Sequence, residues 1–182
     1  MKTKHTLLFF ISFLLLATYI GIAQEEEKEI IVKDTVVKNN KYGFLNKEGK
    51  TMLAPELEKA NAFSEGRAAV KENGKWGFVD RLGNKIVPPI FEAVRDFNES
   101  LAAVRKNGKW GYIDKLGKYV IEPQFRAAWP FSKGLAKAQG DDGKYGYINP
   151  SGRWVIAAQY EELAAFSEGL AVFRQANVYG YL

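Results

Sequence analysis

The side chains that usually carry out chemistry in proteins are sparse in this sequence. The 182 residues include one histidine and no cysteine. That histidine, His5, lies in an N-terminal segment that we expect to be removed from the mature protein. A mature chain without either residue has no nucleophile paired with histidine and no zinc site built from histidine and cysteine. Any catalysis would have to depend on carboxylates alone.

Carboxylates are plentiful, but none stands in a motif that marks catalysis. Glycoside hydrolysis needs two carboxyl groups held at a set separation across a cleft. Glu92, Asp96, Glu161 and Glu162 are spread along the chain without such a pattern. We therefore expect no enzyme, no catalytic residue and no cofactor, and a hydrolase that uses carboxylates alone is a remote alternative.

The N-terminus predicts export. Lys2 and Lys4 precede an apolar run that extends from Leu7 to Ile22, and Gly21-Ile22-Ala23 ends it with small residues. This order is typical of a secretory signal peptide, residues 1–23, with cleavage after Ala23. The alternative is a single membrane anchor, because the run approaches the length of a span. With cleavage, the mature protein has no membrane span and lies in the periplasm or outside the cell.

Charge argues against a nucleic-acid partner. The formal charge of +5 includes Lys2 and Lys4, so the mature chain carries about +3. Its basic residues are spread through the whole chain, whereas nucleic-acid-binding proteins gather them on one face. Residues 24–34 are expected to form a charged spacer, in which Ile30-Ile31-Val32 could add a strand.

A repeat organises the rest of the chain. An aromatic residue followed by glycine begins at positions 42, 76, 110, 145 and 179, so the steps are 34, 34, 35 and 34 residues. A constant period in this range indicates a repeat array. The array spans residues 35–182, in units 33–66, 67–100, 101–134 and 135–169 and a partial unit 170–182. The pairs themselves are Tyr42-Gly43, Trp76-Gly77, Trp110-Gly111, Tyr145-Gly146 and Tyr179-Gly180.

Each unit is predicted to hold three short strands and a connector. Asn73-Gly74 and Asn107-Gly108 separate the first two strands, and Asn-Gly is the strongest signal for a tight hairpin. Successive side chains of a strand face opposite ways, so Trp110 and Tyr112 share one face and Gly111 lies on the other, where the missing Cβ permits close approach. A proline after the third strand should end its ladder. The connector that follows could hold one helical turn.

Asp80 and Asp114 recur at one repeat position with Asn46 and Asn149. The four could form a ladder of metal sites, but two amides reduce the negative charge that Ca²⁺ requires. Each is followed three residues later by glycine, which is the signature of a type I turn. We interpret these residues as turn formers and expect no metal.

One unit buries too little surface to fold alone, so neighbouring units must stack. The chain is therefore predicted to be all-β, with tandem three-stranded meanders stacked as an open β-solenoid-like array. A small closed propeller-like arrangement is the alternative.

The chain resembles the WG-repeat (KWG-repeat) family of bacterial β-repeat proteins. The resemblance rests on Lys75-Trp76-Gly77-Phe78-Val79-Asp80, on the equivalent run at 109–114, on the Asp-x-x-Gly turn and on Ile121-Glu122-Pro123-Gln124-Phe125. It covers residues 36–182. The family implies an interaction or scaffold module and no catalytic residues.

Three rings stand where other units have different residues. Asn61 and Arg95 occupy the position of Trp129, and that of Trp154 holds Thr51, Lys85 and Tyr119. Positions that accept polar residues are not obligatory core positions, and an exposed tryptophan often marks a binding surface. Trp129, Trp154 and Tyr119 are therefore the candidate surface for a protein or a cell-envelope polymer. A lectin-like protein that binds a carbohydrate or small ligand is the alternative.

Overall fold

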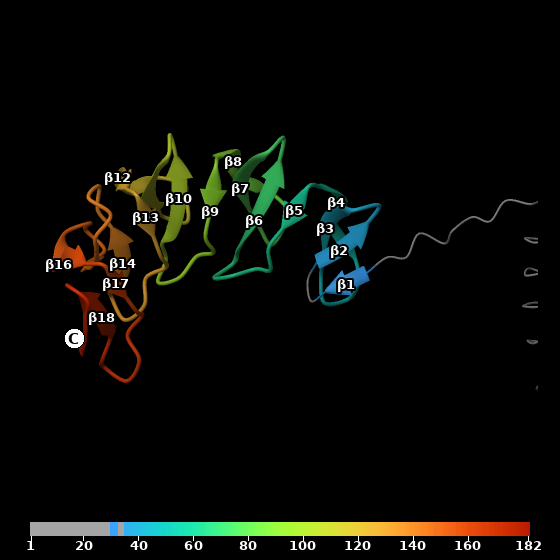
Figure 1. Cartoon of the computed structure of the whole chain (residues 1–182). Helices are drawn as coiled ribbons and strands as arrows, with labels where there is room; N and C mark the ends of the chain where they lie inside the picture. The colour runs from blue at the N-terminus through green and yellow to red at the C-terminus, as the bar shows by residue number, and fades with distance from the viewer. Residues whose placement is uncertain (1–29, 33–34) are drawn as a thin grey trace, which may run out of the picture.

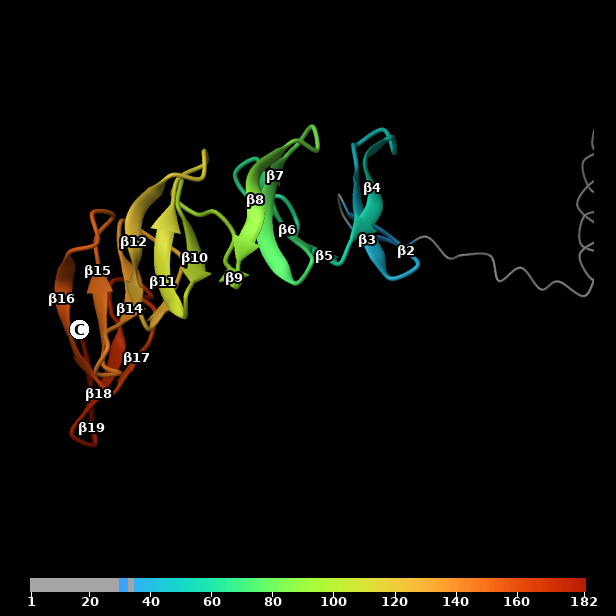
Figure 2. The same cartoon turned by 90° about the horizontal axis from the view of Figure 1, so that it is seen from above.

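The computed structural model describes residues 30–32 and 35–182, and every regular element in that part of the chain is a β-strand. The strands form five small antiparallel sheets that follow one another in a curved row (Figure 1). The first and last sheets lie at opposite ends of the row in both views (Figures 1 and 2). The open array that the repeat predicts is confirmed.

The strands of each sheet are consecutive in sequence. The first sheet contains β1 (Ile30–Val32), β2 (Thr35–Lys38), β3 (Lys41–Leu45) and β4 (Thr51–Leu57). The second contains β5 (Lys59–Ala60), β6 (Arg67–Glu72), β7 (Lys75–Asp80) and β8 (Lys85–Phe91). The third contains β9 (Ala93–Val94), β10 (Ala102–Lys106), β11 (Lys109–Ile113) and β12 (Tyr119–Phe125). The fourth contains β13 (Ala127–Ala128), β14 (Ala136–Gln139), β15 (Tyr145–Ile148) and β16 (Trp154–Tyr160). The last contains β17 (Glu162–Leu163), β18 (Val172–Gln175) and β19 (Val178–Tyr181).

Each repeat unit thus supplies the expected meander, and Ile30–Val32 does add a strand to the first sheet. The predicted signal peptide lies outside the described residues. Within them, no helix is long and apolar enough to cross a membrane.

The connectors differ from the expectation of a helical turn. Each contributes a two-residue strand to the following sheet, as Lys59 and Ala60 do opposite Lys71 and Val70. Each connector then closes in a tight turn. In the first one, Ser64 and Arg67 exchange both backbone hydrogen bonds, and the two residues between them, Glu65 and Gly66, have φ angles of 48° and 80°. Positive φ at two successive positions defines a type I′ turn, which a right-handed helical turn cannot provide.

The predicted turns between strands are confirmed. Asn73 and Gly74 have φ angles of 48° and 74°, as a type I′ hairpin requires. Asp80 accepts hydrogen bonds at Oδ1 from the backbone N–H groups of Leu82 and Asn84, at 2.9 Å each. The hydrogen bond from the Asn84 side chain lowers the pKa of the Asp80 carboxyl, which favours the charged form that accepts these bonds.

The prolines do not end the third strands. β12 continues through Pro123 to Phe125, and its register against β11 shifts between the pairs Tyr112–Ile121 and Trp110–Phe125. Proline lacks the backbone donor that a ladder needs, and the shift places it in a bulge where none is needed. The prediction was wrong because a bulge lets a strand accommodate proline.

The core lies between successive sheets. Tyr112 on one face of the third sheet packs with Phe131, with ring centroids 4.8 Å apart, and contacts residues of the fourth sheet. Ile113 on the opposite face belongs to the cluster shared with the second sheet. Both side chains are fully buried. Stacking therefore covers both faces of each inner sheet. This explains why neighbouring residues of β11, which face opposite sides of the sheet, are both apolar.

Candidate functional site

Three residues that differ from their equivalents in the preceding unit meet where the connectors of the third and fourth units approach each other. Trp129 stands where the second unit has Arg95, and Lys133 stands where it has Glu99. Lys137 stands where the second and third units have Ala69 and Ala103. All three line one cavity of about 280 Å³. The remaining lining residues are Pro130, Ser132, Leu135, Tyr147, Ala165, Phe166 and Gly169.

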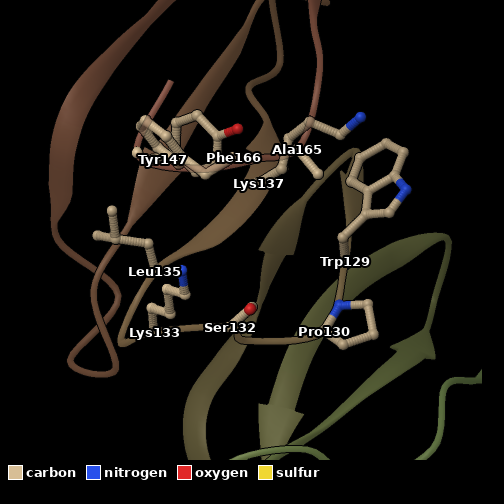
Figure 3. A pocket seen from close by; sticks show the side chains of 10 residues that line it. Trp129, Pro130, Ser132, Lys133, Leu135, Lys137, Tyr147, Ala165 and Phe166 are labelled. Carbon is tan, nitrogen blue, oxygen red and sulfur yellow. The ribbon is translucent and has the colours of Figure 1, made fainter. Parts of the chain in front are cut away.

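The walls of the cavity are rings and aliphatic groups. Figure 3 shows Trp129 and Pro130 on one side and Leu135 on the other, with Tyr147 and Phe166 opposite Ser132. Tyr147 and Phe166 pack with ring centroids 4.7 Å apart, and the Tyr147 hydroxyl donates a hydrogen bond to the Ala164 carbonyl. Burial raises the pKa of Tyr147, so this donor stays protonated. The cavity therefore has a mainly apolar interior.

Trp129 is half-buried, and two cations lie over its ring. The Arg95 guanidinium lies 5.4 Å from the Trp129 ring centroid and also 5.4 Å from that of Trp110. The Lys137 ammonium lies 4.2 Å from the Trp129 centroid. The Trp129 carbonyl accepts a hydrogen bond of 2.7 Å from the Tyr112 hydroxyl. Backbone and ring are both held, so Trp129 is a preorganised wall of the cavity.

Lys137 enters from β14 at a position that holds alanine in the second and third sheets. Its Nζ donates a 3.0 Å hydrogen bond to the carbonyl of Leu163. Desolvation, and secondarily the charge of Arg95, lowers the pKa of Lys137. The ammonium group is therefore a partly desolvated cation at the cavity, where charge interacts more strongly than in water.

Lys133 replaces a glutamate that joins neighbouring connectors. Oε2 of Glu65 accepts the backbone N–H of Ser100, and Oε2 of Glu99 accepts that of Gly134, at 2.9 Å each. The next pair in this series is Lys133 and Gly169, and both line the cavity. Lysine has no acceptor, so the third bond of the series is not made. Lys133 forms no ion pair among residues 35–182.

Trp154 and Tyr119 occupy equivalent positions in successive sheets and do not line this cavity. Trp154 is 39% exposed and packs edge-on against Phe125. Tyr119 packs edge-on against Phe91, and its hydroxyl is buried without a hydrogen-bond partner. Burial raises the pKa of Tyr119, and the nearby Glu122 adds to the effect. Of the three predicted surface rings, only Trp129 lies at the cavity, and their role in binding stays a prediction.

The aromatic-glycine pairs have different environments along the row. The glycine is packed against backbone in the first four pairs, as an added Cβ would lie 2.4 Å from a carbonyl oxygen of the third strand. The aromatic residues of these pairs are partly buried. In the last pair Tyr179 is exposed and Gly180 faces the Phe173 ring. The five aromatic-glycine pairs consist of Tyr42, Gly43, Trp76, Gly77, Trp110, Gly111, Tyr145, Gly146, Tyr179 and Gly180.

Lys133, Lys137, Ser132 and Gly169 were not among the predicted site residues. A column-by-column comparison of the units would have found the two lysines, because one reverses a charge and the other replaces alanine. In residues 30–32 and 35–182 no group of three or more histidine, cysteine, aspartate or glutamate residues is placed to bind a metal. The site is therefore described by its rings and its cations.

The fold and the site define a class of protein, the open β-repeat array. A family model described as "WG containing repeat" matches residues 42–76, 76–110, 110–145 and 145–179. The chain therefore belongs to this family. No curated protein matches the chain.

Two solved structures show similarity at low sequence identity. The computationally designed Ika4 protein is 16% identical, with a TM-score of 0.45 over 66% of this chain and 86% of its own. PorZ is a bacterial surface component of the type-IX secretion system of Porphyromonas gingivalis. It is 9% identical, with a TM-score of 0.32 over 85% of this chain and 25% of its own.

Proposed function

We propose that this protein is an exported, non-enzymatic module that binds a protein or a cell-envelope polymer. The observation that supports this most strongly is that Lys133 and Lys137, which each replace a recurring residue of the repeat, line one cavity with Trp129, which stands at a variable position. Stacking alone does not require lysine at either of these two positions, where the other units carry glutamate or alanine. Pockets that combine apolar walls with a few polar groups are the usual form of a binding site.

The lining of the cavity favours binding over hydrolysis. No carboxylate side chain is among its lining residues, whereas glycoside hydrolysis needs two. A carbohydrate-binding site would offer a free ring face for stacking, but Arg95 and Lys137 already lie over the Trp129 ring. The lectin-like alternative is therefore the weaker of the two binding functions.

Photocrosslinking in the producing organism tests this function. Benzoylphenylalanine is placed at Ser132, beside the cavity, and at Trp154, with Leu82, an exposed residue of a turn in the second unit, as the matched control. We expect a discrete adduct from Ser132 or Trp154 and none from Leu82. Intact mass spectrometry then gives the mass of the adduct. The absence of any adduct from these positions at native expression levels would contradict a binding role.

Export has its own test. The signal peptide predicts that the protein found outside the cytoplasm begins at Gln24. N-terminal peptide mapping of fractionated cells measures this directly. A chain that retains residues 1–23 and fractionates with the membrane would favour the anchor instead.

A further inference from the structure

The cavity between the third and fourth units lacks the carboxylate that fills the corresponding position in the two preceding gaps. There, Glu65 and Glu99 accept the backbone N–H groups of Ser100 and Gly134. Each bond joins one connector turn to the next. In the third gap the acceptor position holds Lys133, and the donor position is Gly169.

Lys133 also reverses the charge of the glutamates that hold this position in the two earlier gaps. Lys133 and Lys137 both line the cavity, and none of the lining residues is acidic. Lys137 is held by the Leu163 carbonyl and the Trp129 ring, whereas Lys133 has no ion-pair partner in the described part of the chain. A backbone donor and an uncommitted ammonium group form a site for an anion.

The rest of the cavity suits an apolar group. The rings of Trp129, Tyr147 and Phe166 form its walls, together with the side chain of Leu135 (Figure 3). Its volume of about 280 Å³ is near the lower end of the range for small-ligand pockets. This space fits one aromatic or branched apolar group and is too small for a long segment of polymer.

We infer that this cavity binds a carboxylate that is attached directly to a small apolar or aromatic group. The ligand carboxylate accepts the Gly169 N–H and pairs with Lys133, in the place that a glutamate of the protein holds in the earlier gaps. The apolar group lies among Trp129, Tyr147 and Phe166. This inference rests on the proposed binding function and names its ligand chemistry. A free small carboxylic acid and the C-terminus of a peptide share that chemistry.

Amide NMR on the isotope-labelled protein, in the form in which it is purified from cells, tests whether this cavity binds a carboxylate. The probes are N-acetyl-phenylalanine and a Gly-Gly-Phe peptide, each compared with its C-terminal amide, and acetate, which lacks the apolar group. We expect saturable movement of the Gly169 amide resonance with the acids. The amides of Ser100 and Gly134 are internal controls, since their acceptor is already present. The amidated probes and acetate should bind at least about tenfold more weakly.

Lys133→Glu supplies the missing acceptor from the protein itself. We expect this variant to shift the Gly169 amide without any probe and to weaken acid binding at least about tenfold. Lys137→Ala, which restores the residue found at positions 69 and 103, is a second variant and should also weaken binding. Response to both probes or to one alone shows which source the site accepts.

The inference is overturned if the Gly169 amide does not respond to either acid, if the amidated probes bind equally well, or if Lys133→Glu leaves affinity unchanged. An adduct from Trp154 without a Gly169 response would leave the proposed function standing and remove this ligand class. A Gly169 response without any adduct of macromolecular size would remove the protein or polymer partner and keep the carboxylate site.

Discussion

At the scale of single residues, the backbone opposite the aromatic-glycine pair decides which residue can follow the aromatic ring. A Cβ atom added to Gly111 would lie 2.4 Å from the backbone carbonyl oxygen of Ile121 and 2.7 Å from the backbone nitrogen of Pro123. Both atoms are backbone, so no rotamer change relieves the contact. The bulge of the third strand brings this backbone close, which links the glycine of one strand to the bulge of the next. The same approach occurs at Gly146, where the bulged strand has alanine in place of proline.

We predict that Gly111→Ala lowers the free energy of unfolding by at least about 3 kcal/mol, the upper end for overpacking. Gly180→Ala is the matched control, because the same motif position there faces only the Phe173 ring, which can move. Its cost should be about 1 kcal/mol. Urea denaturation of the two variants measures both values. Equal costs would show that the bulge does not determine this glycine.

Tyr112 gives a prediction for alkaline pH. Burial is the main cause that raises the pKa of Tyr112 above its ordinary 10.0. Tyr112→Phe should cost about 1 kcal/mol at neutral pH, because the Trp129 carbonyl loses its donor. Above pH 10 the unfolded tyrosine loses its proton while the folded one keeps it. The stability of the wild type therefore falls relative to the variant, by up to about 1.4 kcal/mol per pH unit.

Urea denaturation at pH 7 and at several values above 10 measures this difference. Tyr179→Phe, at an exposed ring, controls for loss of a tyrosine hydroxyl. A stability difference between wild type and Tyr112→Phe that stays constant above pH 10 would contradict the explanation.

Some of these contacts of single residues can be predicted from the sequence. Alternation along a strand predicts that Gly111 faces a close neighbour, and the Asp-x-x-Gly spacing predicts the turn at Asp80. The bulge at Pro123 could not be predicted, because proline is compatible both with the end of a strand and with a bulge. The cavity at Trp129 could not be predicted either, since it depends on which connector turns lie next to each other.

At the scale of elements, the connectors are bonded to one another as well as packed. The carboxylates of Glu65 and Glu99 each reach across to the next connector turn. Lys115 pairs with Glu65 at 3.0 Å and lowers the pKa of that carboxyl. The connector is therefore a hairpin whose position is set by its successor, which local sequence preference does not reveal. This is why a two-residue strand, formed only by pairing, escaped prediction.

This arrangement predicts opposite effects for two substitutions in one repeat column. Glu99→Ala should lower the free energy of unfolding by about 0.5 kcal/mol, a small value because the bond is exposed. Lys133→Glu should raise it by a similar amount, because it adds the missing acceptor for Gly169. Among residues 35–182, Glu168 in the same column accepts no hydrogen bond from another connector turn, so Glu168→Ala should have little effect. Thermal unfolding of the three variants checks the signs, and destabilisation by Lys133→Glu would contradict the series.

At the scale of the whole molecule, the sequence predicts stacking in an open row but leaves a closed ring as the alternative. Each unit contacts its neighbours, so the overall shape depends on the small rotation between successive sheets. That rotation arises from side-chain packing in clusters such as the one around Tyr112 and Phe131. No single repeat position encodes it, and the structure shows that the rotations sum to a curved open row (Figure 2).

An open row predicts a definite order of distances. Lys47, Arg81, Lys115 and Pro150 occupy the same position in four successive turns. Cysteine pairs that join position 47 to each of the other three can carry spin labels without interference, because the chain has no cysteine of its own. We expect the separation measured by pulsed electron resonance to increase at each step. In a closed ring the label at 150 would instead return toward the first unit, so a shorter distance for 47–150 than for 47–115 would rule out the open row.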